Sequence, residues 1–214
     1  QRPQSMAVTL VIINVAIYLV DRLFFEHPVQ EMRLGLSALQ ETLSVTPQVV
    51  TQPWLWWKFV SSGFAHAYDP SHVLWNMFAL WMFGRDIELR FGRQEFLRFY
   101  LVAIVLGSVI WSVIRLGSDV TMLGASGAVT AVVIAYCMLY PKRMLLLMMV
   151  IPVPAWLLGV LIVVVNLVGS RHGNSGIAYD VHLVGATFGF LYCKFGWNLG
   201  RLMPSNFSLG AVLK

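Results

Sequence analysis

The fold is decided by residues 124–140, which read GASGAVTAVVIAYCMLY. Ser126 lies among small residues at the start of this run, and continuous apolar sequence follows it. Further along the chain, His182 stands at the start of a second apolar segment. A hydroxyl and an imidazole are costly inside hydrocarbon, so their position at the start of two apolar segments indicates a functional site within a membrane.

Composition supports a membrane location for the whole chain. Of 214 residues, 58% are hydrophobic and 12% are charged, and the mean hydropathy is +0.72. A soluble domain of this length could not carry so many hydrophobic residues without exposing them to water. The composition therefore predicts a single polytopic membrane domain over residues 1–214. The net charge is +5, but the basic residues lie in short loops and do not form a stripe interleaved with aromatic residues. No nucleic-acid partner is therefore expected.

Six apolar runs predict an all-α membrane protein, a six-transmembrane-helix bundle. Its first loop is expected at about 25–70 and its core helices at about 71–198. Pro152 and Pro154 interrupt the apolar stretch 144–154, which is therefore expected to be an interfacial connector. The predicted spans are 5–24, 71–89, 95–115, 124–140, 154–169 and 180–198.

Lys and Arg set the predicted orientation. If the chain has six spans, both termini lie on the same side of the membrane. That side holds twice as many Lys and Arg residues as the other side. We therefore expect both termini in the cytoplasm, with the protein in a plasma or inner membrane.

Three polar residues are predicted to share one depth. At 1.5 Å per residue, Ser126, His182 and His72 lie about 21, 18 and 20 Å from the inner boundaries of their helices. In a hydrocarbon core about 30 Å thick, all three are submerged but lie nearer the outer surface. The spacing therefore brings three separate helices to one polar level.

These residue types suit acyl transfer. A serine hydroxyl is a weak nucleophile until a base removes its proton, and a neutral imidazole can do so near neutral pH, so Ser126 and His182 are predicted to form a catalytic dyad. His72 and Asn76 share one helix face at i, i+4. With the Ser126 backbone N–H at a helix start, they are candidates for stabilising an oxyanion.

Glycines beside these residues have two interpretations. Gly124 and Gly127 leave room for a substrate backbone, which makes them candidate substrate-binding positions. The same motif is typical of a small-residue face for helix packing, and His182 could equally serve structural hydrogen bonding. Gly185 and Gly189 form a Gly-x-x-x-Gly face, which is predicted to press against the Ser126 helix at Gly127 and Ala131.

Six short motifs follow one another in a familiar order: Trp57-Lys58, His66, His72-x-x-x-Asn76, Glu88-x-x-x-Gly92, Gly124-Ala-Ser126-Gly and His182-x-x-Gly185-x-x-x-Gly189. In this combination the chain resembles the rhomboid family of intramembrane serine proteases. The resemblance implies a Ser-His dyad without a third acidic member, at Ser126 and His182. It also implies oxyanion stabilisation by His72, Asn76 and the Ser126 N–H.

The resemblance further implies which segments interact with the membrane and the substrate. A first loop partly embedded in the outer leaflet would be residues 25–70. A fifth helix and following loop that move to admit substrate would be the helix after Pro154 and residues 169–176.

The chain departs from the family pattern at two positions. Many rhomboids carry Arg where this chain has Lys58, which lacks the planar multi-donor fork, so anchoring of the first loop is expected to differ. Many also carry Tyr four residues after the nucleophile, packed on the catalytic imidazole, where this chain has Thr130. A hydrogen bond from the Thr130 hydroxyl is one candidate substitute. Asp180 is expected to cap its helix and to face away from His182.

The leading hypothesis is an intramembrane serine endopeptidase, surrounded by lipid, that cleaves transmembrane segments of single-pass membrane proteins through an acyl-enzyme. One alternative is a catalytically inert rhomboid-like binder of transmembrane helices. Another is a small proton-coupled transporter that uses His72 and His182 as relay groups. No metal-ligand cluster or phosphate-cradling loop is evident in the sequence, so no metal and no cofactor are expected.

Overall fold

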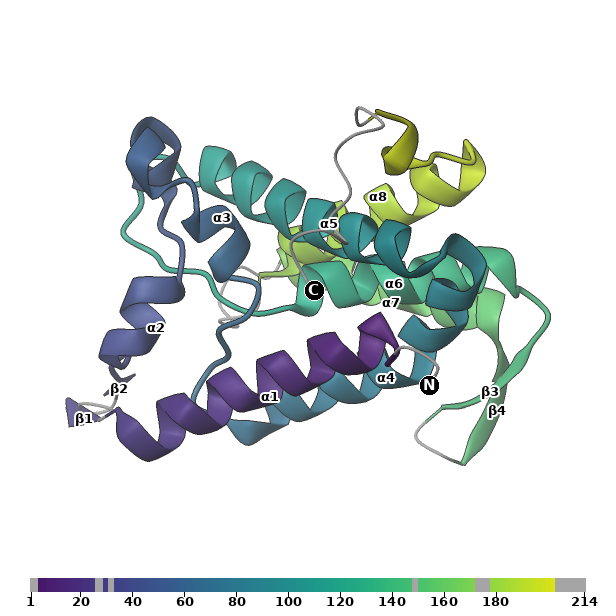
Figure 1. The fold of residues 1–214 in the computed structure, drawn as a ribbon, viewed down its shortest axis with the longest axis horizontal. Coiled ribbons are helices and arrows are strands. Elements are labelled where there is room, and N and C mark those ends of the chain that lie inside the picture. Colours follow the sequence, from purple (N-terminus) through teal and green to yellow (C-terminus); the bar gives the residue numbers. More distant parts are fainter. Residues whose placement is uncertain (1–3, 26–28, 31–32, 148–149, 172–177, 203–214) are drawn as a thin grey trace.

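The computed structural model describes residues 4–25, 29–30, 33–147, 150–171 and 178–202, and the architecture is helical (Figure 1). The long helices begin and end within a few residues of the predicted spans, so the prediction of a mainly helical fold is confirmed. They are α1 (Met6–Phe24), α4 (Pro70–Phe91), α5 (Arg93–Ile114), α6 (Ser126–Leu139), α7 (Ala155–Arg171) and α8 (Tyr179–Lys194). A short 3-10 turn, η3 (Leu199–Leu202), follows α8.

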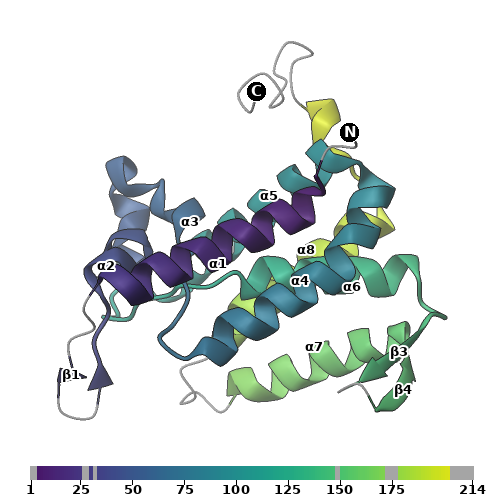
Figure 2. The ribbon, with the colours of Figure 1, turned by 60° about the horizontal axis from the view of Figure 1, so that its bottom comes forward.

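Helix α6 is central and α7 is peripheral. Ten of the 14 residues of α6 are buried, whereas only three of the 17 residues of α7 are, namely Ala155, Gly159 and Asn166. Helices α1 and α4 lie side by side, and α7 lies at the edge of the bundle next to α6 and α8 (Figures 1 and 2). Helix α7 is therefore held by few side chains.

The closest helix contact joins α6 to α8 through small residues. A Cβ atom added to Gly185 would lie 2.0 Å from the carbonyl oxygen of Gly127, and one added to Gly189 would lie 2.4 Å from that of Ala131. Such distances leave no room for a side chain. The predicted packing of the Gly-x-x-x-Gly face on Gly127 and Ala131 is confirmed, and it brings the two backbones into contact.

The first loop is a folded unit rather than an irregular connection. Its helix α2 begins with a capping box, in which the Ser37 hydroxyl accepts from the Gln40 N–H at 3.1 Å and the Gln40 side chain accepts from the Ser37 N–H at 3.3 Å. Its elements are β1 (Val29–Gln30), β2 (Arg33–Leu34), α2 (Ala38–Leu43), η1 (Pro47–Thr51), η2 (Pro53–Leu55) and α3 (Lys58–Ser61).

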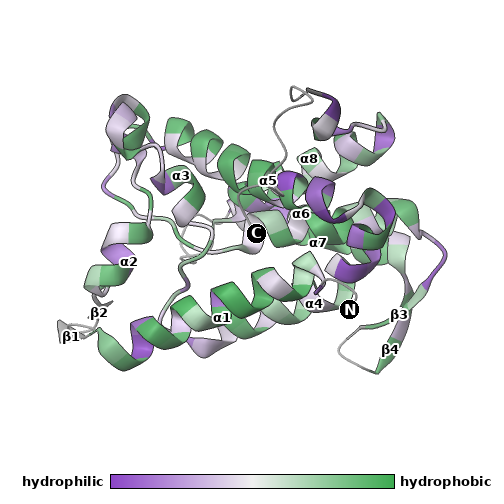
Figure 3. Cartoon of the chain, viewed as in Figure 1, coloured by the Kyte–Doolittle hydropathy of each residue, from purple (hydrophilic) through white to green (hydrophobic). Residues whose placement is uncertain are grey.

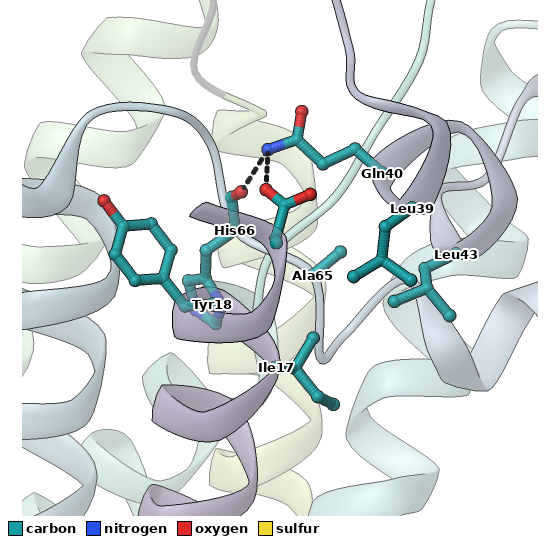
Figure 4. Close-up of a pocket in the computed structure, with 8 residues that line it drawn as sticks. Ile17, Tyr18, Leu39, Gln40, Leu43, Ala65 and His66 are labelled. Atoms are coloured by element: carbon teal, nitrogen blue, oxygen red, sulfur yellow. Dashed lines mark hydrogen bonds between the residues drawn. The ribbon is translucent and has the colours of Figure 1, made fainter. Parts of the chain in front are cut away.

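A buried polar cluster ties this loop to α1. The Gln40 amide donates to the Asp21 carboxylate at 3.0 Å and to the His66 carbonyl oxygen at 2.9 Å (Figure 4). The Ser37 hydroxyl also donates to Asp21. Buried polar groups are tolerated when they are bonded to one another, so this cluster fixes the segment that leads into α4.

Lys58 anchors the loop through its ammonium group. Its ammonium donates to the Glu41 carbonyl oxygen at 2.8 Å. The same ammonium lies 5.7 Å from the centroid of the Trp57 ring. The hydrogen bond is made to one backbone oxygen, in keeping with the compact charge of lysine.

The connector before α7 is a β-hairpin, which the sequence did not predict. Strand β3 (Met144–Leu147) pairs antiparallel with β4 (Ile151–Pro154), and the Ala155 N–H donates to the Arg143 oxygen at 2.9 Å. In an antiparallel ladder, hydrogen-bonded and non-bonded pairs alternate. Pro152 and Pro154 therefore occupy the non-bonded pairs, where a missing N–H breaks no ladder bond, so the prolines are compatible with the hairpin.

Apolar residues predominate along most of the helices (Figure 3). Large hydrophobic side chains such as Leu23 and Val165 are more than half exposed, as expected for a surface in lipid. By length and composition, two helices in the described residues, α1 and α5, could cross a membrane, while α6 and α7 are shorter apolar helices. The six-span count therefore stays a prediction.

Candidate active site

Ser126 and His182 meet at the contact between α6 and α8. Ser126 is the first residue of α6, and His182 lies in the first turn of α8. Their side chains are bonded, with 2.7 Å between Ser126 Oγ and His182 Nε2. The structure thus brings together the two residues predicted to form the dyad, at the distance that proton transfer from hydroxyl to imidazole requires.

The second imidazole nitrogen contacts a residue that sequence reasoning missed. His182 Nδ1 lies 2.8 Å from Oδ1 of Asn166 in α7. The Asn166 amide nitrogen in turn donates to the Ile162 carbonyl oxygen at 2.8 Å. One signal could have identified it: Asn166 interrupts the apolar run 160–168, where an amide side chain is costly without a partner.

Two other candidates for orienting His182 have different partners. The Thr130 hydroxyl donates to the Ser126 carbonyl oxygen at 2.7 Å, so the predicted Thr130 substitute for the family tyrosine is wrong. A hydroxyl within a helix readily bonds the carbonyl one turn back. The Asp180 carboxylate pairs with Arg115 rather than with His182, as predicted, but it does not form the expected helix cap, because the N-cap of α8 makes no side-chain hydrogen bond.

His72 presents a proton-bearing nitrogen near Ser126. Its Nδ1 accepts from the Ala67 backbone N–H at 3.2 Å, and a backbone N–H can only donate. In a neutral ring, the hydrogen therefore sits on Nε2, on the side that faces Gly124. The His66 ring packs edge-on against His72, with 5.2 Å between centroids, and burial lowers the pKa of His66 to about 3. Burial therefore favours the neutral form of the His66 imidazole.

Asn76 lies one turn after His72 on the same face of α4. Its amide nitrogen donates to the His72 carbonyl oxygen at 2.9 Å. An amide nitrogen carries two hydrogens, so a second one remains for a further acceptor.

The two glycines near Ser126 have different surroundings. Gly124 has φ +126°, and an added Cβ would lie 2.9 Å from the His72 ring, so both backbone geometry and space require glycine there. Gly127 instead faces α8, where an added Cβ would meet the Val181 side chain at 2.6 Å. Gly124 lines the cavity described below, and Gly127 lies between the helices. A substrate-binding role for either glycine stays a prediction.

A cavity of about 1180 Å³ opens at this end of the bundle. This volume exceeds that of typical small-molecule pockets and would hold a segment of peptide. Both polar side chains and aromatic rings line it. The lining includes Ser126, His182, His72, Asn76, Trp75, Trp111 and Tyr179.

Two further predictions concern this end of the molecule. The loop predicted to move with the fifth helix includes residues 172–177, which lie outside the described residues. Among the residues that the structure describes, no three His, Cys, Asp or Glu side chains are grouped as metal ligands.

Comparison with known proteins assigns the family. The family model described as "Rhomboid domain" matches residues 53–198, which is more than half of the chain and includes every residue of the site above. The chain belongs to the rhomboid family. The resemblance inferred from the sequence motifs is thereby confirmed.

Several curated rhomboid proteins are similar to this rhomboid chain. It is 35% identical over 143 residues to RHOMBOID-like protein 12, mitochondrial, of Arabidopsis thaliana, which covers 59% of this chain and 42% of the relative. It is 32% identical over 148 residues to Rhomboid protein 1, mitochondrial, of Saccharomyces cerevisiae (66% and 41%). It is 33% identical over 148 residues to Presenilin-associated rhomboid-like protein A, mitochondrial, of Danio rerio (65% and 37%). The matched region thus spans about two fifths of each relative.

The names of these rhomboid relatives correct one prediction. They place the relatives in mitochondria, so the predicted plasma or inner membrane with cytoplasmic termini is wrong. The Lys and Arg asymmetry used for that prediction reports which side of a membrane a loop occupies. It carries no information on which membrane holds the protein.

Proposed function

We propose that this rhomboid is an intramembrane serine endopeptidase with Ser126 as nucleophile and His182 as general base. The observation that carries the proposal is the 2.7 Å contact between Ser126 Oγ and His182 Nε2 beside a large cavity. Polar groups inside a membrane are costly, and here two helices place such groups at one point. A catalytic role accounts for this cost better than a purely structural hydrogen bond does. A nucleophile hydrogen-bonded to a base that is itself hydrogen-bonded is the usual arrangement for covalent catalysis.

In the proposed reaction, Ser126 Oγ bonds to the scissile carbonyl carbon as its proton passes to His182 Nε2. The carbonyl oxygen becomes an oxyanion, which would accept hydrogen bonds from His72 Nε2–H, from the second Asn76 amide hydrogen and from the Ser126 backbone N–H. Collapse of this intermediate breaks the C–N bond, and the leaving amine takes the proton from Nε2. The Ser126 ester is then hydrolysed by water, with His182 again acting as base.

The proposed substrates are transmembrane segments of single-pass membrane proteins. In this proposal α1, α4, α5, α6, α7 and α8 are the six spans of a single domain over residues 1–214, surrounded by lipid. The apolar residues of the helices (Figure 3), the large hydrophobic side chains among them that are exposed, and the cavity at one end of the bundle support this arrangement. A helical substrate hides its amides in hydrogen bonds, so segments with helix-weak residues near the cut should be preferred.

The test is cleavage of a labelled transmembrane substrate in liposomes by wild type and by Ser126→Ala. Ser118→Ala is a matched control, because that hydroxyl lies in the α5–α6 loop and donates to the Arg115 carbonyl oxygen. Wild type and Ser118→Ala should cleave, and Ser126→Ala should not. Equal cleavage by Ser126→Ala would refute the proposal.

A further inference from the structure

Asn166 is a buried polar residue in α7, a helix that is mostly apolar and largely exposed. Its exposed fraction is 8%, while Val165 and Leu167 beside it are 60% and 47% exposed. A buried amide lowers stability unless its donor and acceptor are both bonded. In Asn166 both are, through Ile162 and His182. The residue therefore directs its oxygen at the imidazole of the dyad.

The hydrogen bonds fix the orientation of this amide. The Ile162 carbonyl oxygen can only accept, so the group 2.8 Å from it is the amide nitrogen. The group 2.8 Å from His182 Nδ1 is then the amide oxygen, which can only accept. Nδ1 must carry the hydrogen of the neutral ring.

That tautomer is the one that catalysis requires. With the hydrogen on Nδ1, His182 Nε2 is left with a lone pair, and it is this nitrogen that lies 2.7 Å from Ser126 Oγ. The opposite orientation of the amide would select the wrong tautomer, which abolishes most activity when an asparagine replaces the acid of a serine-protease triad. The bond to Ile162 prevents that orientation.

We propose that Asn166 is a positioning residue that completes a Ser126–His182–Asn166 relay. This proposal rests on the protease function proposed above. The amide oxygen holds the imidazole in one tautomer and one rotation, and it stabilises the imidazolium formed when Ser126 loses its proton. It takes the orienting position left open by Thr130, whose hydroxyl is bonded to its own helix. The relay joins α6, α8 and α7, so the third member belongs to the peripheral helix.

Three variants test this relay. Asn166→Leu keeps the approximate volume but loses the acceptor, Asn166→Asp keeps an acceptor at Nδ1, and Val165→Ala is a control on the exposed face of the same helix. Cleavage in liposomes should show kcat lowered about 10- to 100-fold in Asn166→Leu with little change in KM. Asn166→Asp should stay within about tenfold of wild type, and Val165→Ala should match it.

Nitrogen-15 NMR of the imidazoles supplies a readout independent of cleavage. The chain has five histidines, so a His182→Gln spectrum assigns the His182 signals by difference. The proton should lie on Nδ1 in wild type and shift toward Nε2 in Asn166→Leu. If Asn166→Leu does not fold, Asn166→Asp decides, and loss of activity in the folded Asp variant contradicts the proposal.

The outcomes separate the two proposals. An unchanged kcat and tautomer in Asn166→Leu, with Ser126-dependent cleavage by wild type, would overturn the relay alone. A change confined to KM would also overturn it. Wild-type cleavage equal to that of Ser126→Ala would instead remove the proposed protease function, and the NMR result would then decide the orienting role of Asn166 by itself.

Discussion

Replacing Gly185 by alanine should separate the catalytic pair by pushing α8 away from α6. The added Cβ would lie 2.0 Å from the Gly127 carbonyl oxygen, whereas ordinary van der Waals contact is at 3.4–4 Å. The atoms that the new Cβ would meet belong to the Gly127 backbone. No side-chain rotation can relieve this clash. The helices must separate by about 1 Å or more.

That separation acts directly on the dyad, because His182 lies one turn before Gly185. If α8 moves as a rigid body, the 2.7 Å contact between Ser126 Oγ and His182 Nε2 lengthens to about 3.7 Å, beyond hydrogen-bond range. A misplacement of about 1 Å can lower a rate by about 100-fold. Overpacking should also lower the free energy of unfolding by about 1 to 3 kcal/mol.

The assay is cleavage of a transmembrane substrate in liposomes, with thermal unfolding measured in the same lipid to confirm that the variant is folded. Thr187→Ala is the matched control, since it lies on the exposed face of α8 and should keep wild-type activity. A folded Gly185→Ala protein that cleaves within about threefold of wild type would refute the reasoning that this backbone contact sets the dyad distance.

Three further variants test other parts of the site and fold. Gly124→Ala should lower kcat by about 100-fold, since the new Cβ meets the His72 ring and the φ of +126° is unfavourable for alanine; normal turnover would argue against His72 as an oxyanion donor. Asp180→Asn should change kcat by less than about threefold, because that carboxylate pairs with Arg115 rather than His182; a loss as large as that of His182→Ala would show a catalytic role. Glu95→Ala should lower the free energy of unfolding by about 3 kcal/mol, measured by denaturant titration, because this buried carboxylate accepts from the Gly200 N–H at 2.9 Å and from Arg98 at 3.1 Å; unchanged stability would contradict that structural role.

Much of the fold could be predicted because its signals are local. Apolar runs bounded by charge or proline give the long helices, and Pro70 at the first position of α4 marks its start. The Gly185 and Gly189 spacing also pointed to a close helix contact. The β3–β4 hairpin escaped prediction because compatibility of two prolines with a strand depends on the pairing register, which only the folded chain reveals.

The site was predictable where costly polar groups occur at helix starts, as with Ser126, His182 and His72. Asn166 was missed although it interrupts an apolar run, because the sequence alone does not show that its amide oxygen is oriented toward His182. That orientation follows from the Ile162 bond and from the approach of α7 to α8. The Thr130 prediction was wrong for a related reason, since a threonine hydroxyl within a helix bonds its own backbone before reaching a neighbour.

Covalent labelling tests most directly whether Ser126 is an activated nucleophile. The protein in liposomes would be treated with a fluorophosphonate, digested and analysed by mass spectrometry. We expect one adduct on Ser126, abolished in His182→Ala and retained in Ser118→Ala. Labelling of other serines at the same rate, or labelling of Ser126 that is unaffected by loss of His182, would contradict a dyad at this position.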